Sequence, residues 1–300
     1  MPQVPNAPAE IAPSQGPRRR RKRGLLVVFV CLAVLASAAA YFSPLRLMLT
    51  GSDDDSVLAY ERSQRHFRAT WGMPLPGTPD LAHLPQRLAE NGLTQGAPVL
   101  LRIFKREFEL ELWMKRDGVF HRFATYPICR WSGSLGPKLQ QGDRQTPEGF
   151  YSVDAGALNP NSRWYRSFNL GFPNAFDSAH SRTGSFIMVH GGCASIGCFA
   201  MTNAQMDEIW RLVTAALDHG QKRFQVQVYP FRLSDEKLAL YAGHTAEPFW
   251  RSLMRGNDLF EATLLPPRVH VCSGAYVFEP ADADGDGVIE NRCPAAAPKS

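Results

Sequence analysis

The chain has 300 residues, of which 44% are apolar and 20% are charged, a composition typical of a globular protein rather than a disordered one. Its formal net charge of +5 is concentrated in one place, because the six basic residues at 18–23 exceed the whole excess. The remainder is nearly neutral, so charge gives no argument for nucleic-acid binding.

The N-terminal part has the pattern of an export or anchoring segment. Residues 1–17 are rich in Pro and Ala, and the basic run is followed by an uncharged apolar stretch that reaches about Phe42. We therefore predict a cytoplasmic basic segment, 1–23, and a transmembrane anchor or signal segment, 24–45. A cleavable signal peptide remains the alternative, because small residues at 36–40 resemble a cleavage site. Either alternative exports the rest of the chain.

Six cysteines are present, and Cys31 lies in the apolar segment. The other five would face an oxidising compartment, where cysteines are commonly paired. Because five is odd, at least one thiol stays free or pairs between molecules. We expect Cys272 and Cys293 to form a disulfide that closes the C-terminal tail.

Residues 46–96 form a lead-in of helices and loops. A helix is predicted over 56–69, and a second short helix over 81–91 ends at Gly92. Between them, closely spaced Pro and Gly residues interrupt the chain.

From Pro98 the apolar pattern changes to a period of two residues. Strands are predicted over 99–104, 108–113 and 119–129, and Asp117-Gly118 is typical of a hairpin turn between the last two. This order indicates a β meander rather than βαβ units.

The remaining segments alternate between loops, strands and helices. We expect a loop over 133–149, short strands over 150–153 and 186–189, irregular chain over 159–182, and a strand over 224–228. Thr202 and Gln205 form a capping-box pattern, which starts a helix that ends at Gly220. The extension 231–300 carries weaker helical signals over 238–240 and 248–254. The fold class is therefore mainly β with flanking helices (α+β), a sheet sandwich or partial barrel.

The chemistry is concentrated in residues 187–202, at the junction between a strand and the capped helix. Cys198 precedes Thr202 by four residues, so we expect the helix dipole and free N–H groups to lower the pKa of its thiol. These N–H groups could also stabilise a tetrahedral oxyanion. His190, at the strand end, could take the thiol proton.

Spacing alone leaves three interpretations of this segment open. The first is a Cys-His nucleophilic pair. The second is a metal site, in which His190, Cys193 and Cys198 are ligands and His180 or His219 completes the set. The third is structural, with a disulfide between Cys193 and Cys198 and a merely packed histidine.

The segment resembles the signature of the YkuD-type L,D-transpeptidase family, with His190-Gly191 followed by Ser195-x-Gly197-Cys198-Phe199-x-Met201. Thr146-Pro147-Glu148-Gly149 is similar to a second family motif. The YafK-like branch, murein L,D-transpeptidase-related proteins, is more similar still, and the shared segments are 103–105, 129–133, 136–138, 169–174 and 190–193. The resemblance covers about 97–230, which we assign as the catalytic domain.

The resemblance implies a role for each matched residue. Cys198 is the nucleophile, His190 is the proton donor and acceptor, and Gly197 contributes a backbone N–H to the oxyanion hole. Ser195 and Asn169 are expected to bind substrate, as is Arg182 through a stem carboxylate. No metal and no cofactor are implied. Two positions depart from many members, which have His where this chain has Ile196 and Arg where it has Ala200.

The implied reaction is attack by the Cys198 thiolate on the diaminopimelate carbonyl of a peptidoglycan stem peptide, giving a thioester. An amine resolves the thioester in transfer, and water resolves it in hydrolysis. The basic run and the apolar stretch after it predict a location on the periplasmic side of a bacterial inner membrane. One alternative is an amidase that releases a stem-attached envelope lipoprotein, and another is a non-catalytic or metal-binding envelope module.

Overall fold

The computed structural model describes residues 27–33, 54–281 and 289–294. Residues 27–33 form a short helix, and a compact unit begins at Glu61. The predicted segment 1–23 and most of the predicted membrane segment 24–45 lie outside the described residues. Within the described ranges, no helix combines the length and the apolar character that crossing a bilayer requires.

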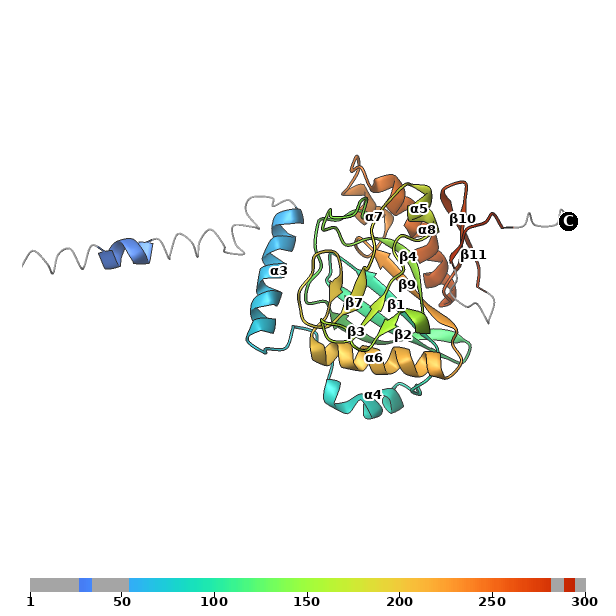
Figure 1. Cartoon of the computed structure of the whole chain (residues 1–300), viewed down its shortest axis with the longest axis horizontal. Helices are drawn as coiled ribbons and strands as arrows, with labels where there is room; N and C mark the ends of the chain where they lie inside the picture. The colour runs from blue at the N-terminus through green and yellow to red at the C-terminus, as the bar shows by residue number, and fades with distance from the viewer. Residues whose placement is uncertain (1–26, 34–53, 282–288, 295–300) are drawn as a thin grey trace, which may run out of the picture. The chain divides into compact units, whose positions relative to one another are not determined.

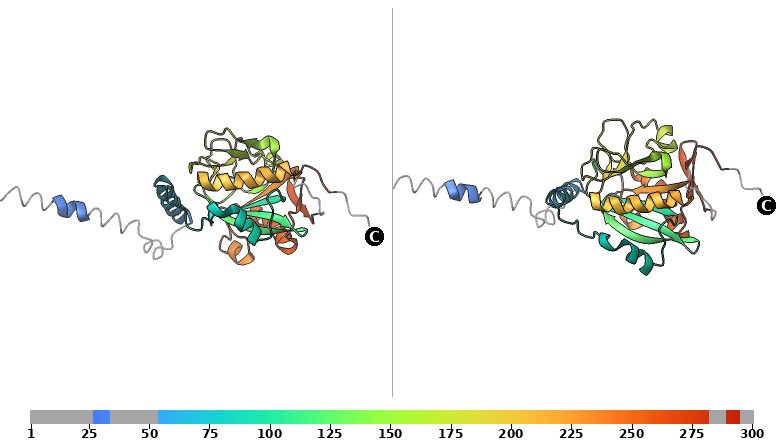
Figure 2. Two further views of the ribbon diagram at one scale, coloured as in Figure 1. Left: turned by 90° about the horizontal axis from the view of Figure 1, so that it is seen from below. Right: turned by 60° about the horizontal axis from the view of Figure 1, so that its bottom comes forward.

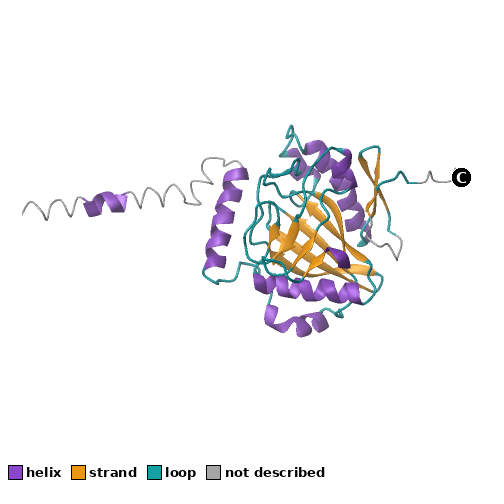
Figure 3. Cartoon of the chain, viewed as in Figure 1, coloured by secondary structure: helices purple, strands orange, loops and turns teal. Residues whose placement is uncertain are grey.

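Strands fill the interior of the compact unit and helices lie at its periphery (Figure 3). The strands are β1 Val99–Phe104, β2 Glu109–Arg116, β3 Val119–Pro127, β4 Gly149–Asp154, β5 Leu158–Asn159, β6 Ser167–Asn169, β7 Met188–His190, β8 Phe199–Ala200, β9 Arg223–Tyr229, β10 Arg268–Cys272, β11 Ala275–Glu279 and β12 Ile289–Glu290. The helices are α3 Asp54–Thr70, α4 Leu84–Glu90, α5 Ala175–Ala179, α6 Asn203–Asp218, α7 Asp235–Ala239 and α8 Glu247–Thr263, as labelled in part in Figure 1. The predicted α+β class is confirmed.

The largest sheet has the strand order β3-β2-β1-β9-β4. The predicted meander is confirmed, because β1, β2 and β3 pair antiparallel, with Leu101 opposite Leu112. β9 then returns parallel to β1, with Ile103 opposite Val228. Apolar side chains at Leu101, Ile103, Leu112 and Val228 are fully buried, so this sheet forms much of the core.

A second sheet of four strands, β5-β6-β7-β8, carries the segment of chemical interest. β6 pairs antiparallel with β7, and β7 pairs parallel with β8. β6 and α5 lie within 159–182, which we predicted to be irregular. Both elements are very short, and elements of this length give little periodic signal in a sequence.

Helix α6 begins as predicted. The Thr202 hydroxyl accepts from the Gln205 N–H and the Gln205 side chain accepts from the Thr202 N–H, which is the reciprocal capping box. Its buried face carries Met206, Ile209 and Val213 at helical spacing. In both views of Figure 2, α6 lies between the β5–β8 segment and the β1–β3 meander.

The extension after residue 230 is more ordered than its sequence indicated. Helix α8 is longer than the predicted 248–254, and a third sheet of order β11-β10-β12 follows it. A Cβ at Gly256 of α8 would lie within 2.6 Å of the rings of Phe150 and Phe278, so glycine is needed for this close packing. The extension thus packs against the strand that follows the long loop.

Candidate active site

The predicted base, His190, ends β7, and the predicted nucleophile, Cys198, directly precedes β8, the parallel neighbour of β7 in the second sheet. Val189 of β7 is in register with Phe199 of β8, which places Cys198 beside Met188. Side chains alternate along a strand, so His190 lies on the face of the sheet opposite to Val189, and Cys198 directly precedes Phe199. The opposite face is apolar, since Val189 and Phe199 are fully buried.

The Cys198 thiol is held by two backbone groups. Its Sγ accepts from the Met188 N–H at 3.4 Å, and the thiol donates to the Phe186 carbonyl at 3.7 Å. Phe186 has a φ of 54°, an unusual conformation for a bulky residue, and its ring is 76% exposed. The backbone therefore directs the Phe186 carbonyl to the thiol and its ring to solvent.

The prediction that the α6 dipole lowers the pKa of Cys198 is wrong. Burial raises the pKa of the Cys198 thiol, and the Met188 N–H and the Lys138 charge oppose this only in part. The physical reason is that β8 separates Cys198 from the helix start, where Thr202 and Gln205 cap each other. The resting residue is therefore a thiol at neutral pH.

His190 is buried and has a defined tautomer. Its Nδ1 lies 2.5 Å from the Gly191 carbonyl, which can only accept, so Nδ1 carries the proton and Nε2 is left as the acceptor. Burial lowers the pKa of His190, although the bond to Gly191 opposes the shift. A neutral imidazole with a basic Nε2 is the form that a proton acceptor requires.

Trp164 covers this histidine, with ring centroids 6.1 Å apart. The two glycines after His190 allow close packing, Gly192 against Trp164 and Gly191 against Asn203. A Cβ at Gly192 would lie 3.2 Å from the Trp164 ring, and one at Gly191 would lie 2.6 Å from the Asn203 side-chain oxygen. Trp164 lies in the segment 159–182, which we predicted to be irregular, and the structure places its ring next to that of His190.

The disulfides decide between the three interpretations of the segment. Cys193 is bonded to Cys129 and not to Cys198, so the proposed Cys193–Cys198 disulfide is wrong. The same bond removes Cys193 as a metal ligand. The predicted Cys272–Cys293 disulfide is confirmed. Of the cysteines in the compact unit, Cys198 is the free one, as the odd count indicated.

The remaining candidate metal ligands are also engaged elsewhere. The Nδ1 of His180 lies 2.9 Å from the Phe176 carbonyl, and the Nδ1 of His219 lies 2.7 Å from the Ala215 carbonyl. Each histidine thus completes the C-terminal turn of its own helix. Among the residues that the structure describes, no group of three or more His, Cys, Asp or Glu side chains could hold a metal ion.

Ser195 and Gly197 form a turn under the nucleophile. The Ser195 hydroxyl donates to the Cys198 carbonyl at 2.7 Å and accepts from the Gly197 N–H at 3.2 Å. Ser195 therefore contacts the backbone of the nucleophile, where we expected a substrate contact. The Gly197 N–H, predicted as an oxyanion donor, already has a partner in the resting structure.

The other two predicted substrate contacts lie in different surroundings. Asn169 pairs with Met188 across the sheet, and its side-chain oxygen accepts from the Gly171 N–H at 3.1 Å. Arg182 is buried, donates to the Asp177 carboxylate at 2.7 Å and packs over the Phe249 ring. This ion pair argues against the predicted contact of Arg182 with a stem carboxylate, because its charge is already neutralised inside the fold.

Sequence reasoning did not identify Lys138. Its ammonium is buried, pairs with the Asp143 carboxylate and donates to the Gln140 carbonyl at 2.9 Å. Its charge acts on Cys198, where it lowers the pKa of the thiol. The available signal was the Gly136-Pro137-Lys138 segment, which is part of the family resemblance.

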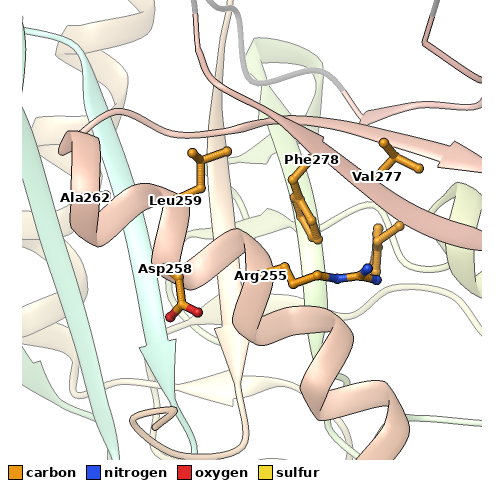
Figure 4. Close-up of a pocket in the computed structure, with 7 residues that line it drawn as sticks. Arg255, Asp258, Leu259, Ala262, Val277 and Phe278 are labelled. Atoms are coloured by element: carbon orange, nitrogen blue, oxygen red, sulfur yellow. The ribbon is translucent and has the colours of Figure 1, made fainter. Parts of the chain in front are cut away.

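A groove lies apart from these residues, between α8 and β11 (Figure 4). It is lined by Arg255, Asp258, Leu259, Ala262, Tyr276, Val277 and Phe278. None of the predicted site residues lines it.

Comparisons with known proteins agree with the motifs. Residues 103–228 match the model of the YkuD family, described as the L,D-transpeptidase catalytic domain. The chain is 48% identical to YafK of Escherichia coli K12 over 182 aligned residues. The aligned segment covers 61% of this chain and 74% of that protein. YafK of Escherichia coli O157:H7 gives the same values. Among solved structures, the helical cell shape determining protein Pgp2 from Campylobacter jejuni is 21% identical, with a TM-score of 0.37, over 60% of this chain and 67% of that chain.

Proposed function

Because the chain belongs to the YkuD family of L,D-transpeptidases, we propose that it processes peptidoglycan stem peptides by acyl transfer through a Cys198 thioester. One observation carries the proposal. Cys198 is the free thiol of the compact unit, and it directly precedes β8, which pairs with the strand that ends at the buried, neutral His190.

The chemistry starts from a neutral thiol and a neutral imidazole. The Cys198 proton moves to Nε2 of His190 as the sulfur attacks the diaminopimelate carbonyl, forming the C–S bond and a tetrahedral oxyanion. The C–N bond then breaks, and the imidazolium returns the proton to the leaving amine. The thiol hydrogen points to the Phe186 carbonyl at rest, so it must rotate toward His190 first.

The thioester can be resolved by an amine or by water, and we propose transfer as the first possibility. Ile196 lies two residues before Cys198 and is 81% exposed. It therefore presents an apolar side chain to solvent close to the nucleophile in the sequence. Many family members have a histidine at this position. Because this chain departs from them here, we keep hydrolysis of the thioester by water as the second possibility. Release of an envelope lipoprotein attached to the stem would be one such hydrolysis.

We further propose that the catalytic unit acts on the periplasmic side of the inner membrane. The basic run at 18–23 and the apolar residues after it support this location. Residues 24–45 would be an anchor or a cleaved signal.

The test is incubation of the full-length protein, in detergent, with purified muropeptides. Mass spectrometry should detect a thioester adduct on Cys198, and the adduct should disappear in Cys198→Ala but persist in the matched Cys193→Ala variant. A new cross-link on addition of an amine acceptor indicates transfer, and a free stem carboxyl indicates hydrolysis. Product formation that survives Cys198→Ala but is abolished in Cys193→Ala or by a chelator would overturn the proposal.

A further inference from the structure

The carbonyl of Cys198 accepts hydrogen bonds from two hydroxyl groups, one close to it in the sequence and one far from it. Ser195, three residues earlier, donates at 2.7 Å. Thr146, in the long loop before β4, donates at 3.4 Å. The Thr146 side chain is fully buried, where a hydroxyl costs free energy unless it is hydrogen-bonded.

Each hydroxyl oxygen also accepts a hydrogen bond from the main chain. The Ser132 N–H donates to the Thr146 hydroxyl oxygen at 3.0 Å, and the Gly197 N–H donates to the Ser195 hydroxyl oxygen at 3.2 Å. Since an N–H can only donate, each hydroxyl oxygen acts as an acceptor there, which leaves its own proton for the Cys198 carbonyl.

Ser132 connects the two halves of this arrangement. Its hydroxyl lies 3.3 Å from the Ser195 hydroxyl, and its carbonyl accepts from the Thr146 N–H at 2.9 Å. Ser132, Thr146 and Ser195 therefore form one hydrogen-bonded group, which we call the hydroxyl clamp. It joins the loop before β4 to the turn that carries the nucleophile.

We propose that Ser195 and Thr146 are positioning residues for the acyl transfer, acting through the Cys198 backbone. Holding the carbonyl fixes the orientation of the Cys198 peptide, and with it the direction of the Cα–Cβ bond that carries the sulfur. A displacement of about 1 Å at a reacting atom can cost roughly 100-fold in rate. The inference rests on the proposed function, because it requires Cys198 to be the nucleophile.

The hydroxyl clamp predicts kinetics that differ from those of a substrate-binding role. If the Ser195 hydroxyl bound substrate, removing it would raise KM. If it positions the nucleophile, removing it lowers kcat and leaves KM unchanged. The shorter Ser195 bond should matter more than the longer Thr146 bond.

The experiment measures kcat and KM for muropeptide turnover in full-length Ser195→Ala and Thr146→Val, with thermal unfolding as the check on folding. We expect kcat to fall about tenfold in Ser195→Ala and about threefold in Thr146→Val, equivalent to about 1.4 and about 0.65 kcal/mol of transition-state free energy. KM should stay within about twofold of wild type in both. The conservative variants Ser195→Thr and Thr146→Ser should recover most of kcat.

The matched control is Ser152→Ala, because that buried hydroxyl on β4 has no hydrogen-bond partner among the described residues. It should leave kcat unchanged. Wild-type kcat in both clamp variants overturns the proposal, and so does a raised KM with unchanged kcat in Ser195→Ala. Thr146→Val has the shape of threonine and decides the question if Ser195→Ala fails to fold. Absence of a thioester adduct in the wild-type protein is a separate result, which refutes the proposed function itself.

Discussion

The ammonium of Lys105 donates a 2.8 Å hydrogen bond to the carboxylate of Glu148, and neither side chain has any exposed surface. The same ammonium donates to the carbonyls of Ser134, Gly136 and Thr146, each at 3.0 Å. One buried cation thus fixes the long loop at three points, and one of them is the residue whose hydroxyl contacts Cys198.

Replacing Lys105 with methionine should therefore destabilise the fold and slow the reaction together. The change leaves the Glu148 carboxylate buried without its cation, which typically costs about 3–5 kcal/mol. Urea unfolding measures the destabilisation, and Lys222→Met, at an exposed position, is the control that should stay within about 0.5 kcal/mol of wild type. Equal midpoints for the two variants would contradict this account.

The disulfide between Cys129 and Cys193 should stabilise the chain more than the one between Cys272 and Cys293. The first closes 64 residues and the second closes 21. Loop-closure entropy gives about 4 and about 3 kcal/mol for them. Unfolding of the two double-alanine variants, compared in the same buffer, tests the order. The reverse order would show that the entropy of the unfolded chain does not decide which disulfide stabilises the protein more.

Arg182→Ala should reduce stability without changing KM. The substitution leaves the buried Asp177 carboxylate without the ion pair that opposes its desolvation, and burial already raises the pKa of Asp177. We expect a destabilisation of about 3 kcal/mol or more. Arg163→Ala, at an exposed position, serves as the control for stability. If KM rises in Arg182→Ala while the unfolding midpoint is unchanged, the result would support the predicted contact between Arg182 and a stem carboxylate.

The acid limb of the pH–rate profile should lie below pH 6.5. Burial lowers the pKa of His190 from its ordinary value of about 6.5, so the basic form persists as the pH falls toward that lowered value. The same shift means that protonating His190 opposes folding, and its contribution to stability is lost as the pH falls below about 6.5. Profiles of kcat/KM for wild type and for His219→Gln should coincide, and a limb above pH 6.5 would argue against His190 as the base.

Alkylation of Cys198 by iodoacetamide should accelerate only above the usual thiol range. Burial raises the pKa of this thiol, and the thiolate is the species that reacts. The alkylation rate of Cys198 is measured as a function of pH and compared with that of a small cysteine peptide, whose thiol pKa is about 8.5. A midpoint below that of the peptide would mean that the Met188 N–H and the Lys138 charge outweigh burial.

Much of the fold was predictable because its signals are local. Alternating apolar residues over 99–129 gave the meander, and Thr202 with Gln205 gave the start of α6. The sheet of β10, β11 and β12 was not predicted. β12 has only two residues and pairs with β10 across segment 282–288, whereas the β10–β11 hairpin is local and was missed.

The candidate site divides in the same way. The odd number of cysteines after the apolar segment, together with the Ser-x-Gly-Cys pattern, singled out Cys198 from the sequence alone. Which residues contact or bond to one another around Cys198 could be learned only from the tertiary structure. Cys193 pairs with Cys129 across 64 residues, and Ser195 faces the Cys198 carbonyl rather than the substrate.

By itself, the sequence determined which residue types stand at the strand–helix junction, because spacing along the chain decides which neighbours share a turn or a strand face. It could not determine the protonation of those residues. The pKa values of Cys198 and His190 depend on how much water the surrounding strands exclude and on which distant charges come close. Folding places the two-residue strand β8 between the thiol and the helix dipole, and burial raises the pKa of the Cys198 thiol and lowers that of the His190 imidazole, so both are neutral at rest.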